Sequence, residues 1–328
     1  MTTKRALIAS LLLALAAPLV AAAPASAQIK WNLPAAYAAN NYHSENLVWF
    51  ADEVKKATGG KLEITVHPGA SLFKAPEIKR AVATGQAQMG EVLISIHENE
   101  DAIYGLDTIP FLASSYTEAY KLWQAQKAAM GKKLDAQGIM LLFAVAWGPQ
   151  GLYVNKDVNS VEDLKGLKMR AYNVGTTRIA ELVGAQAVTV QAADLPQALA
   201  TGTVNAFMTS GATGYDTKTW ETISHFYDCQ GWIPKNVIMV SKAAFASLPK
   251  DQQDALLKVS AEAETRGWKI AEEKSNWYLG ELKAKGMKVL PPSEALNSGL
   301  KKIGEQLVAD WEKRASPEAK EVLAAYKK

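Results

Sequence analysis

"LKMRAYNVGTTRIAELVGAQAVTVQ", residues 167–191, is the stretch that decides the fold. Its first six residues alternate between two faces, which is the period of a β-strand. Residues 174–185 have the pattern of a helix that opens after Asn173, and residues 186–191 again have the composition of a strand. A strand, a helix and a strand in this order predict two parallel strands joined by a crossover helix, so we expect an α/β protein.

The same order of elements occurs throughout the first two thirds of the chain. In the first half it predicts strands at 29–36, 61–69 and 87–95, and helices at 43–60 and 75–86. In the second half a helix at 193–202 and a strand at 203–210 follow the opening unit. "AVATGQAQM" (81–89) and "ALATGTVNA" (198–206) even share alanine, threonine and glycine in register. Chance similarity between two alanine-rich helix ends is the alternative, but the repeated order favours two similar lobes, each with a parallel sheet.

Residues 249–285 break this pattern. They contain no strand signal, and their apolar residues recur at helical spacing. The pattern is longer than the roughly 8–20 residues of an ordinary helix. We therefore expect a helix over about 250–285 that spans both lobes. The expected division assigns 28–147 with about 236–275 to the first lobe, and 148–235 with about 276–328 to the second lobe.

The N-terminus indicates the compartment. Lys4 and Arg5 precede an apolar run from Ala6 to Ala23, and "ASA" (25–27) matches a signal-peptidase site. Residues 1–27 are therefore expected to be a secretory signal peptide, with a retained helical anchor as the alternative. No later stretch approaches the roughly 18 consecutive apolar residues of a membrane span, so we expect a protein exported to a bacterial periplasm.

The composition argues against several classes of protein. Removal of residues 1–27 takes away two positive charges and no acidic residue, which lowers the formal charge from +3 to +1. With no basic run, we expect no nucleic-acid partner. Cys229 is the only cysteine, so an internal disulfide or a thiol metal cluster is excluded, and we expect a small buried residue there.

Motifs of catalysis are also missing. The chain has no GxSxG and no HExxH, and "KATGGKLE" (56–63) lacks the first glycine and the final Ser or Thr of a P-loop. Its four histidines do not have metal-ligand spacing: His43, His67, His97 and His225. We expect no enzymatic activity, no cofactor and no metal, although a site built from distant residues stays open.

Arg170 lies near the end of the strand that opens the deciding stretch. In open α/β sheets, ligands bind outside the carboxyl ends of the strands, so this arginine would face the cleft between two lobes. Its planar guanidinium matches a carboxylate, and the helix that follows adds N–H donors. These features predict a site for an anionic small molecule. The alternative is an arginine that is exposed or paired with an internal carboxylate.

The chain resembles the extracytoplasmic solute-binding proteins of TRAP (tripartite ATP-independent periplasmic) transporters, of the C4-dicarboxylate-binding type. The resemblance covers nearly the whole mature chain, and "DLKGLKMR" (163–170) is its most specific part. The other stretches that carry it are "FADEVKKATGGKLEITVHPGASLF" (50–73), "IKRAVATGQAQMGEV" (78–92), "IPFL" (109–112) and "ALATGTVNAFMTS" (198–210). The resemblance implies a two-lobed periplasmic binding protein fold. It also implies that Arg170 pairs with the carboxylate of the ligand.

Further ligand contacts are expected around Arg170, with ordinary turn or cap chemistry as the alternative for each. Many sugar-acid binders of the family have a second arginine where this chain has Gln150. The resemblance therefore implies a ligand that needs only one strong anchor for an anionic group. The other candidates in the second lobe are Asn173, Thr209, Ser210 and Phe207, and those in the first lobe are Tyr37, His43, Glu91 and Ser95. Aromatic residues at the expected strand ends complete the set: Trp147, Tyr172 and Trp232.

The aromatic candidates favour a monocarboxylate, including an aromatic one, over a C4-dicarboxylate or a sugar acid. We expect a monomer that closes its lobes over this organic acid and delivers it to an integral-membrane TRAP permease. Two other functions stay open at this point. One is a binding protein of an ATP-driven importer, and the other is a periplasmic enzyme that acts on small acids.

Overall fold

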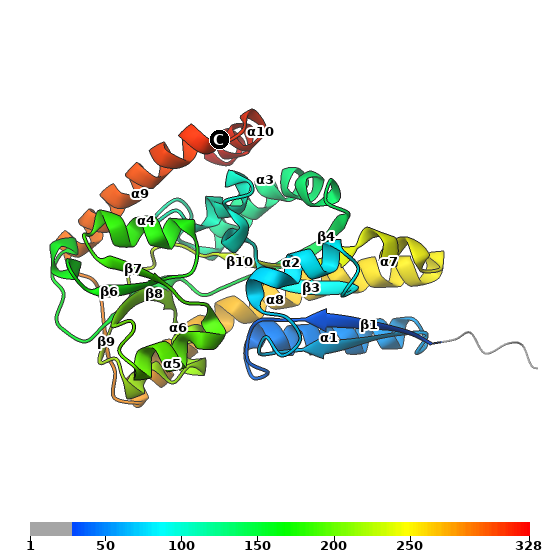
Figure 1. Cartoon of the computed structure of the whole chain (residues 1–328), viewed down its shortest axis with the longest axis horizontal. Coiled ribbons are helices and arrows are strands. Elements are labelled where there is room, and N and C mark those ends of the chain that lie inside the picture. Colours follow the sequence, from blue (N-terminus) through cyan, green and yellow to red (C-terminus); the bar gives the residue numbers. More distant parts are fainter. Residues whose placement is uncertain (1–27) are drawn as a thin grey trace, which may run out of the picture.

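The computed structural model describes residues 28–328, and the expected signal peptide at 1–27 lies outside this range. The described chain forms two α/β lobes side by side (Figure 1). Lobe I holds a two-stranded and a three-stranded sheet, and lobe II holds one six-stranded sheet. The α/β fold class is therefore confirmed. None of the helices between residues 28 and 328 combines the length and the apolar character that a bilayer crossing requires.

Lobe I begins with β1 (Ile29–Pro34) and β2 (Leu62–His67), which pair in parallel. Its second sheet has the order β3 (Met89–Leu93), β10 (Lys235–Ser241) and β4 (Ile139–Ala146), all antiparallel. The expected single parallel sheet of the first half is wrong, because β3 hydrogen-bonds to a strand that the chain supplies about 145 residues later. The helices of lobe I are α1 (Tyr42–Ala57), α2 (Ala75–Ala83), α3 (Tyr116–Asp135) and α7 (Lys242–Ser247), with 3-10 turns η1 (Ile94–His97) and η2 (Ala102–Thr108).

Lobe II has the strand order β11 (Lys288–Leu290), β9 (His225–Tyr227), β5 (Gln150–Val154), β8 (Ala206–Ser210), β6 (Lys168–Ala171) and β7 (Gln186–Thr189). As expected, β6 runs parallel to both β7 and β8. The carboxyl ends of these three strands therefore lie at one edge of the sheet. The helices of lobe II are α4 (Val174–Leu182), α5 (Leu195–Ala200) and α6 (Gly211–Asp216), with 3-10 turns η3 (Val161–Leu164), η4 (Ala192–Asp194) and η5 (Thr219–Glu221).

Two chain segments pass between the lobes in contact with each other. The first joins β4 to β5 and the second joins β9 to β10. Three backbone hydrogen bonds hold them together: Trp147 N to Pro234 O (2.8 Å), Gln150 N to Trp232 O (2.9 Å) and Gly231 N to Gln150 O (2.9 Å). A pair of narrow crossings of this kind can act as a hinge.

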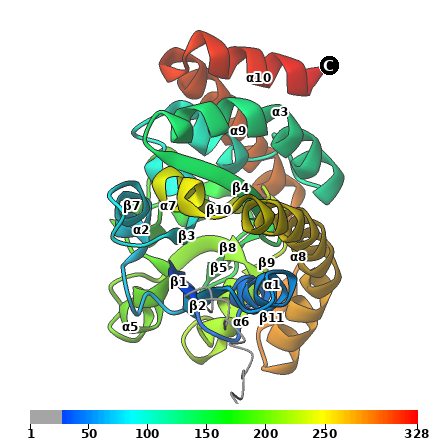
Figure 2. The ribbon, with the colours of Figure 1, turned by 90° about the vertical axis from the view of Figure 1, so that its right-hand side faces the viewer.

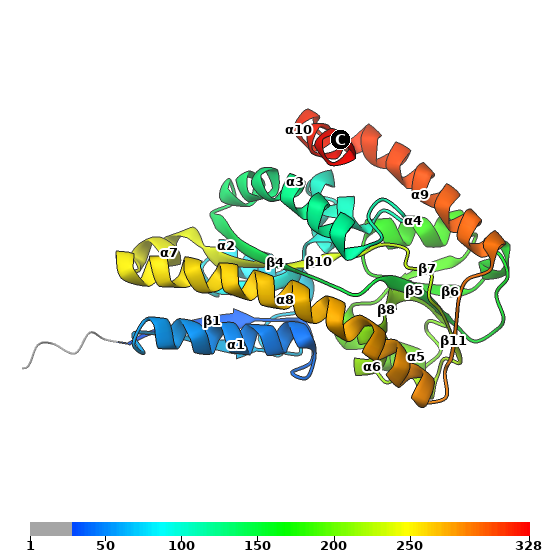
Figure 3. The same cartoon turned by 180° about the vertical axis from the view of Figure 1, so that it is seen from behind.

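Helix α8 (Lys250–Ala284), 35 residues long, runs along both lobes (Figure 3). In lobe I, Trp268 Nε1 donates to Ala144 O at 3.0 Å, and Gly267 lies where a Cβ would collide with Val145. In lobe II, a Cβ on Gly211 of α6 would sit 3.2 Å from Tyr278 Cβ of the helix. The long helix therefore packs closely against each lobe in turn.

Helix α9 (Glu294–Arg314) is a second connection between the lobes. Near its start, Gly299 packs against Val161 of lobe II. Further along, a Cβ on Gly304 would lie 2.2 Å from the Pro110 carbonyl oxygen of lobe I. Helix α10 (Pro317–Lys327) lies on α3 of lobe I (Figure 2), and Tyr326 donates its hydroxyl to Leu112 O at 2.7 Å. The expected assignment of 276–328 to the second lobe is therefore wrong for α10.

A buried ion pair joins the first residue of β10 to η2. Lys235 Nζ lies 2.7 Å from Asp107 Oδ2 and 3.0 Å from Gln126 Oε1, and both charged side chains are about 1% exposed. Asp107 Oδ2 also accepts from the Lys235 backbone N–H at 3.0 Å. These bonds pair two charges that burial would otherwise make very costly, although Asp107 Oδ1 has no hydrogen-bond partner within residues 28–328.

Replacing Lys235 with methionine leaves the Asp107 carboxylate buried without a cation. We expect the free energy of unfolding to fall by about 3–5 kcal/mol, measured by urea unfolding followed by circular dichroism. The control is Lys250→Met, because the Lys250–Asp254 pair is exposed and its loss should have little effect. A Lys235→Met protein as stable as the wild type would contradict the prediction.

Candidate functional site

Arg170 projects from the carboxyl end of β6, and its side chain is held in one orientation. Its Nε donates to Val190 O at 2.9 Å, and its guanidinium lies over the Tyr172 ring at 4.9 Å. The residue is 3% exposed, and no carboxylate within residues 28–328 pairs with it. Burial lowers the pKa of Arg170 to about 10, so the group is charged at neutral pH. Its Nη1 is buried without a hydrogen-bond partner, which leaves a fixed donor with a positive charge for a ligand.

A small cavity of about 30 Å³ lies at Arg170, between the two lobes. Lobe I and the hinge segments supply Tyr37, Leu93, Trp147 and Pro234. Lobe II supplies Gln150, Arg170, Tyr172, Gln191, Ala192, Thr209 and Thr213. Two wider recesses of about 210 and 320 Å³ share Tyr37 and Ala192 with this cavity and lie between the same lobes. The three spaces together form an interlobe cleft whose deepest part holds the arginine.

Two of the expected residues form a hydrogen-bonded wall beside the guanidinium. Tyr172 OH donates to Gln150 Oε1 at 3.3 Å, and Gln150 Nε2 donates to Gly148 O at 2.8 Å. Gln191 was not predicted, and it donates through Nε2 to Tyr172 O at 3.4 Å. Its position at the carboxyl end of the expected strand 186–191 could have identified it, by the same argument that selected Arg170.

Asn173 and Ser95 are brought together, but they do not line the cavity. Asn173 Nδ2 donates to Ser95 Oγ at 2.9 Å, which joins α4 of lobe II to η1 of lobe I. The Asn173 side-chain oxygen accepts from Thr176 N at 2.8 Å and caps α4. The structure thus places this pair as a direct link between the lobes.

His43 and Glu91 lie behind Tyr37 and Trp147, the aromatic residues that lobe I and the hinge segments contribute to the cavity. Both side chains are buried, with Nδ1 of the histidine 3.4 Å from Oε1 of the glutamate, and the histidine ring lies 4.2 Å from the Trp147 ring. Burial lowers the pKa of His43 below its ordinary value. Both oxygens of Glu91 lack a hydrogen-bond partner. The carboxylate can therefore still accept hydrogen bonds, close to the cleft.

The remaining candidates lie in different parts of the structure. Phe207 stacks on Tyr153 at 4.7 Å inside the separate apolar core of lobe II, so it does not reach the cavity. Ser210 caps α6 by accepting from Thr213 N at 3.2 Å. Trp232 is fully buried in the hinge segment, and its indole N–H has no partner. Thr209, by contrast, lines the cavity as expected for the end of β8.

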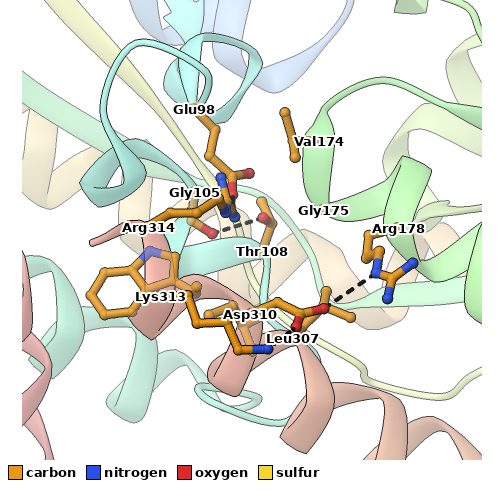
Figure 4. A pocket seen from close by; sticks show the side chains of 12 residues that line it. Glu98, Gly105, Thr108, Val174, Gly175, Arg178, Leu307, Asp310, Lys313 and Arg314 are labelled. Atoms are coloured by element: carbon orange, nitrogen blue, oxygen red, sulfur yellow. Dashed lines mark hydrogen bonds and ion pairs between the residues drawn. The ribbon is translucent and has the colours of Figure 1, made fainter.

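A separate cavity of about 340 Å³ lies between η2, α4 and α9 (Figure 4). Its charged groups are already paired with one another. Arg314 Nη2 lies 2.6 Å from Glu98 Oε1, and Arg178 Nε lies 3.3 Å from Asp310 Oδ2. This cavity therefore lacks the uncompensated cation that distinguishes the smaller space at Arg170.

Two α/β lobes joined by crossing segments, with a buried and unpaired cation in the cleft, are the architecture of a periplasmic solute-binding protein. The chain belongs to family 7 of the bacterial extracellular solute-binding proteins, the DctP family, which matches residues 35–314. It is an extracytoplasmic solute-binding protein of the TRAP transporter type, as the sequence predicted.

Solved structures of similar proteins agree with this assignment. The Bordetella pertussis receptor DctP6, which binds pyroglutamic acid, is 52% identical with a TM-score of 0.90, over 91% of this chain and 99% of that chain. DctP7 from the same organism, also with pyroglutamic acid, is 42% identical with the same TM-score and coverage. A marine metagenome TRAP protein with co-purified pyroglutamate is 45% identical at TM-score 0.90, over 92% and 99% of the two chains.

A more distant relative has a known ligand class in its name. The monocarboxylate 2-oxoacid-binding periplasmic protein of Nostoc is 25% identical over 275 residues, which is 82% of this chain and 74% of the relative.

Cys229 lies outside the cavity and is 4% exposed. Burial raises the pKa of its thiol to about 12, so very little reactive thiolate exists at pH 8. We expect Ellman's reagent to modify the native protein hardly at all at pH 8 and to modify one thiol after denaturation in guanidinium chloride. Rapid modification of the folded protein would show that the hinge segment around Cys229 opens.

Proposed function

We propose that this chain is exported through its N-terminal segment to the periplasm. There it captures a small cyclic monocarboxylate as a monomer and delivers it to a TRAP permease in the membrane. The observation that carries the proposal is the Nη1 atom of Arg170, which is buried, charged and without a partner at the cleft. A ligand carboxylate is the natural partner for such a group.

The charges around the cavity favour one carboxylate over two. Arg170 is the only arginine or lysine among the residues that line it. Burial, together with the nearby Glu91 carboxylate, raises the pKa of Tyr37. A second carboxylate on the ligand would be repelled by Glu91. A C4-dicarboxylate such as succinate therefore fits the site less well than a monocarboxylate.

The polar atoms near the Tyr37 hydroxyl favour a ring with an amide. Besides Arg170 Nη1, the Asn236 Nδ2 group is a buried donor without a partner, and the Glu91 oxygens are acceptors without a partner. Pyroglutamate offers a carboxylate and a lactam carbonyl as acceptors and one ring N–H as a donor. We propose that its carboxylate binds Arg170 and that its carbonyl and N–H point toward Asn236 and Glu91, which lie behind the residues that line the cavity.

The size of the cavity and the similar proteins support the same ligand. A space of about 30 Å³ between closed lobes favours a compact five-membered ring over a larger aromatic acid. Three similar solved structures, 42–52% identical to this chain, hold pyroglutamate. A 2-oxo acid is the second candidate, because the Nostoc relative is named for that class.

Lobe closure is the proposed mechanism of capture. Tyr37 and Trp147 reach the ligand from one side of the cleft and Arg170 from the other, so the complete set of contacts exists only when the lobes are together. The ligand then shifts the population toward the closed form, by an amount that is set by the free energy of the contacts made only in that form. The permease would recognise the closed protein.

Removing the guanidinium should abolish the main ligand contact. We expect Arg170→Ala to weaken pyroglutamate binding roughly a hundred-fold to several thousand-fold, from a loss of about 3–5 kcal/mol. Isothermal titration calorimetry measures the affinity, and circular dichroism checks the fold. Arg178→Ala is the matched control, because this arginine is partly exposed and paired with Asp310 outside the ligand cavity. Equal affinity of Arg170→Ala and the wild type for pyroglutamate would contradict the proposal.

The identity of the ligand can be read directly from the protein. We expect native mass spectrometry of periplasmic protein to show a monomer with one pyroglutamate bound. Thermal shift assays of the emptied protein should then rank pyroglutamate above pyruvate, with succinate and benzoate last. A larger shift with succinate than with pyroglutamate would contradict the argument from Glu91.

A further inference from the structure

A second direct link between the lobes lies in the outer cleft, away from Arg170. Asn41, the N-cap of α1 in lobe I, donates through Nδ2 to Asp216 Oδ2 of lobe II at 2.6 Å. The same amide holds its own orientation, because its oxygen accepts from His43 N at 2.8 Å. Asn41 and Asp216 both line the recess of about 210 Å³ that adjoins the ligand cavity.

The Asp216 carboxylate is poorly compensated in this position. Its Oδ1 is buried and has no hydrogen-bond partner. The cation that faces it, Lys274 of α8, already pairs with Glu45 of α1 at 3.1 Å. The other titratable groups that face it carry no positive charge: Tyr42 on α1, Tyr153 on β5 and Tyr278 on α8.

These contacts depend on the position of lobe I. Asp216 belongs to α6 of lobe II, whereas Tyr42 and Glu45 belong to α1 of lobe I and Asn41 is the N-cap of that helix. Separation of the lobes would return the carboxylate to water and break its bond to Asn41. Closure therefore forms one hydrogen bond and buries one charge at the same step.

We propose that Asn41 and Asp216 form a clasp that holds the lobes closed, and that a proton on Asp216 strengthens it, so ligand is held more tightly in acid than at neutral pH. The proton would sit on Oδ1, the atom without a partner, and the bond from Asn41 to Oδ2 would persist. This inference rests on the proposed lobe closure and not on the identity of the ligand.

The direction of the effect follows from the two states of the carboxyl group. Burial raises the pKa of Asp216 to about 6 in the closed form, whereas a hydrated aspartate titrates near 3.9. Because the closed form has the higher pKa, it binds the proton more tightly, and closure becomes more favourable as the pH falls below about 6. From pH 7 to pH 5 the closed-to-open ratio should rise by about tenfold.

The test measures pyroglutamate affinity of the full mature protein at pH 7 and pH 5 by calorimetry. The ligand stays ionised at both values, because an α-carboxyl group titrates near 3.5. We expect wild-type affinity to rise about tenfold at pH 5. Asp216→Asn keeps the size and the hydrogen bond without the charge, so its affinity should be the same at both pH values. It should also exceed that of the wild type at pH 7.

A matched variant separates the clasp from any general effect of acid. Ser95→Ala removes a different hydrogen bond between the lobes, from Asn173 Nδ2 to Ser95 Oγ, which contains no titratable group. This variant should bind more weakly at both pH values and keep the tenfold dependence on pH. A flat wild-type profile, or a dependence on pH that persists in Asp216→Asn, overturns the proposal.

Failure of the proposed ligand would be recognised separately, as no pyroglutamate binding at either pH. Single-molecule energy transfer in the ligand-free protein then reports closure directly, between dyes on two exposed positions, Lys56→Cys in lobe I and Thr201→Cys in lobe II. The buried Cys229 is expected to stay unlabelled. The clasp predicts a closed-to-open ratio about tenfold higher at pH 5 than at pH 7, and no such change when Asp216→Asn is added. An unchanged ratio in the parent protein overturns the clasp.

Discussion

A guanidinium that is buried without a carboxylate of its own is the constraint on which this molecule depends. Burial of a charge is costly unless a partner compensates it. Arg170 keeps part of that compensation inside the protein, through Val190 O and the face of Tyr172, and leaves Nη1 unused. The desolvation of Nη1 that remains uncompensated favours the binding of an anion. The contrast with Lys235, which is equally buried but fully paired with Asp107, separates a ligand site from a structural ion pair.

The connections between the lobes explain how this site can open. The crossing segments at Trp147 and Pro234 are short, whereas α8 and α9 contact both lobes over their length. Against this common frame, side-chain pairs such as Asn173 with Ser95 and Asn41 with Asp216 join the facing surfaces directly. Because these links are single hydrogen bonds, a ligand that adds contacts across the cleft can decide the balance between open and closed forms.

Much of the architecture was predictable because it is encoded locally. The helix expected at about 250–285 is observed at Lys250–Ala284, and the strands that carry Arg170 and Thr209 are where the period of two indicated. Errors arose where partners are distant in sequence. The parallel sheet expected in the first half fails because β10 inserts beside β3, and α10 lies on lobe I because its apolar face packs on α3. Neither the strand pattern of 87–95 nor the helix pattern of the C-terminus specifies which surface it will meet.

The candidate site shows the same division. By itself the sequence determined that Arg170 stands at the carboxyl end of a strand in an α/β lobe, because alternation and strand order are properties of neighbouring residues. Only the tertiary structure decided that Phe207 is core, that Asn173 bonds Ser95 instead of lining the cavity, and that Asp216 meets Asn41 across 175 residues. The physical reason is that burial and hydrogen bonding are satisfied by whichever group arrives from elsewhere in the chain. That information exists only once both lobes are folded and placed together.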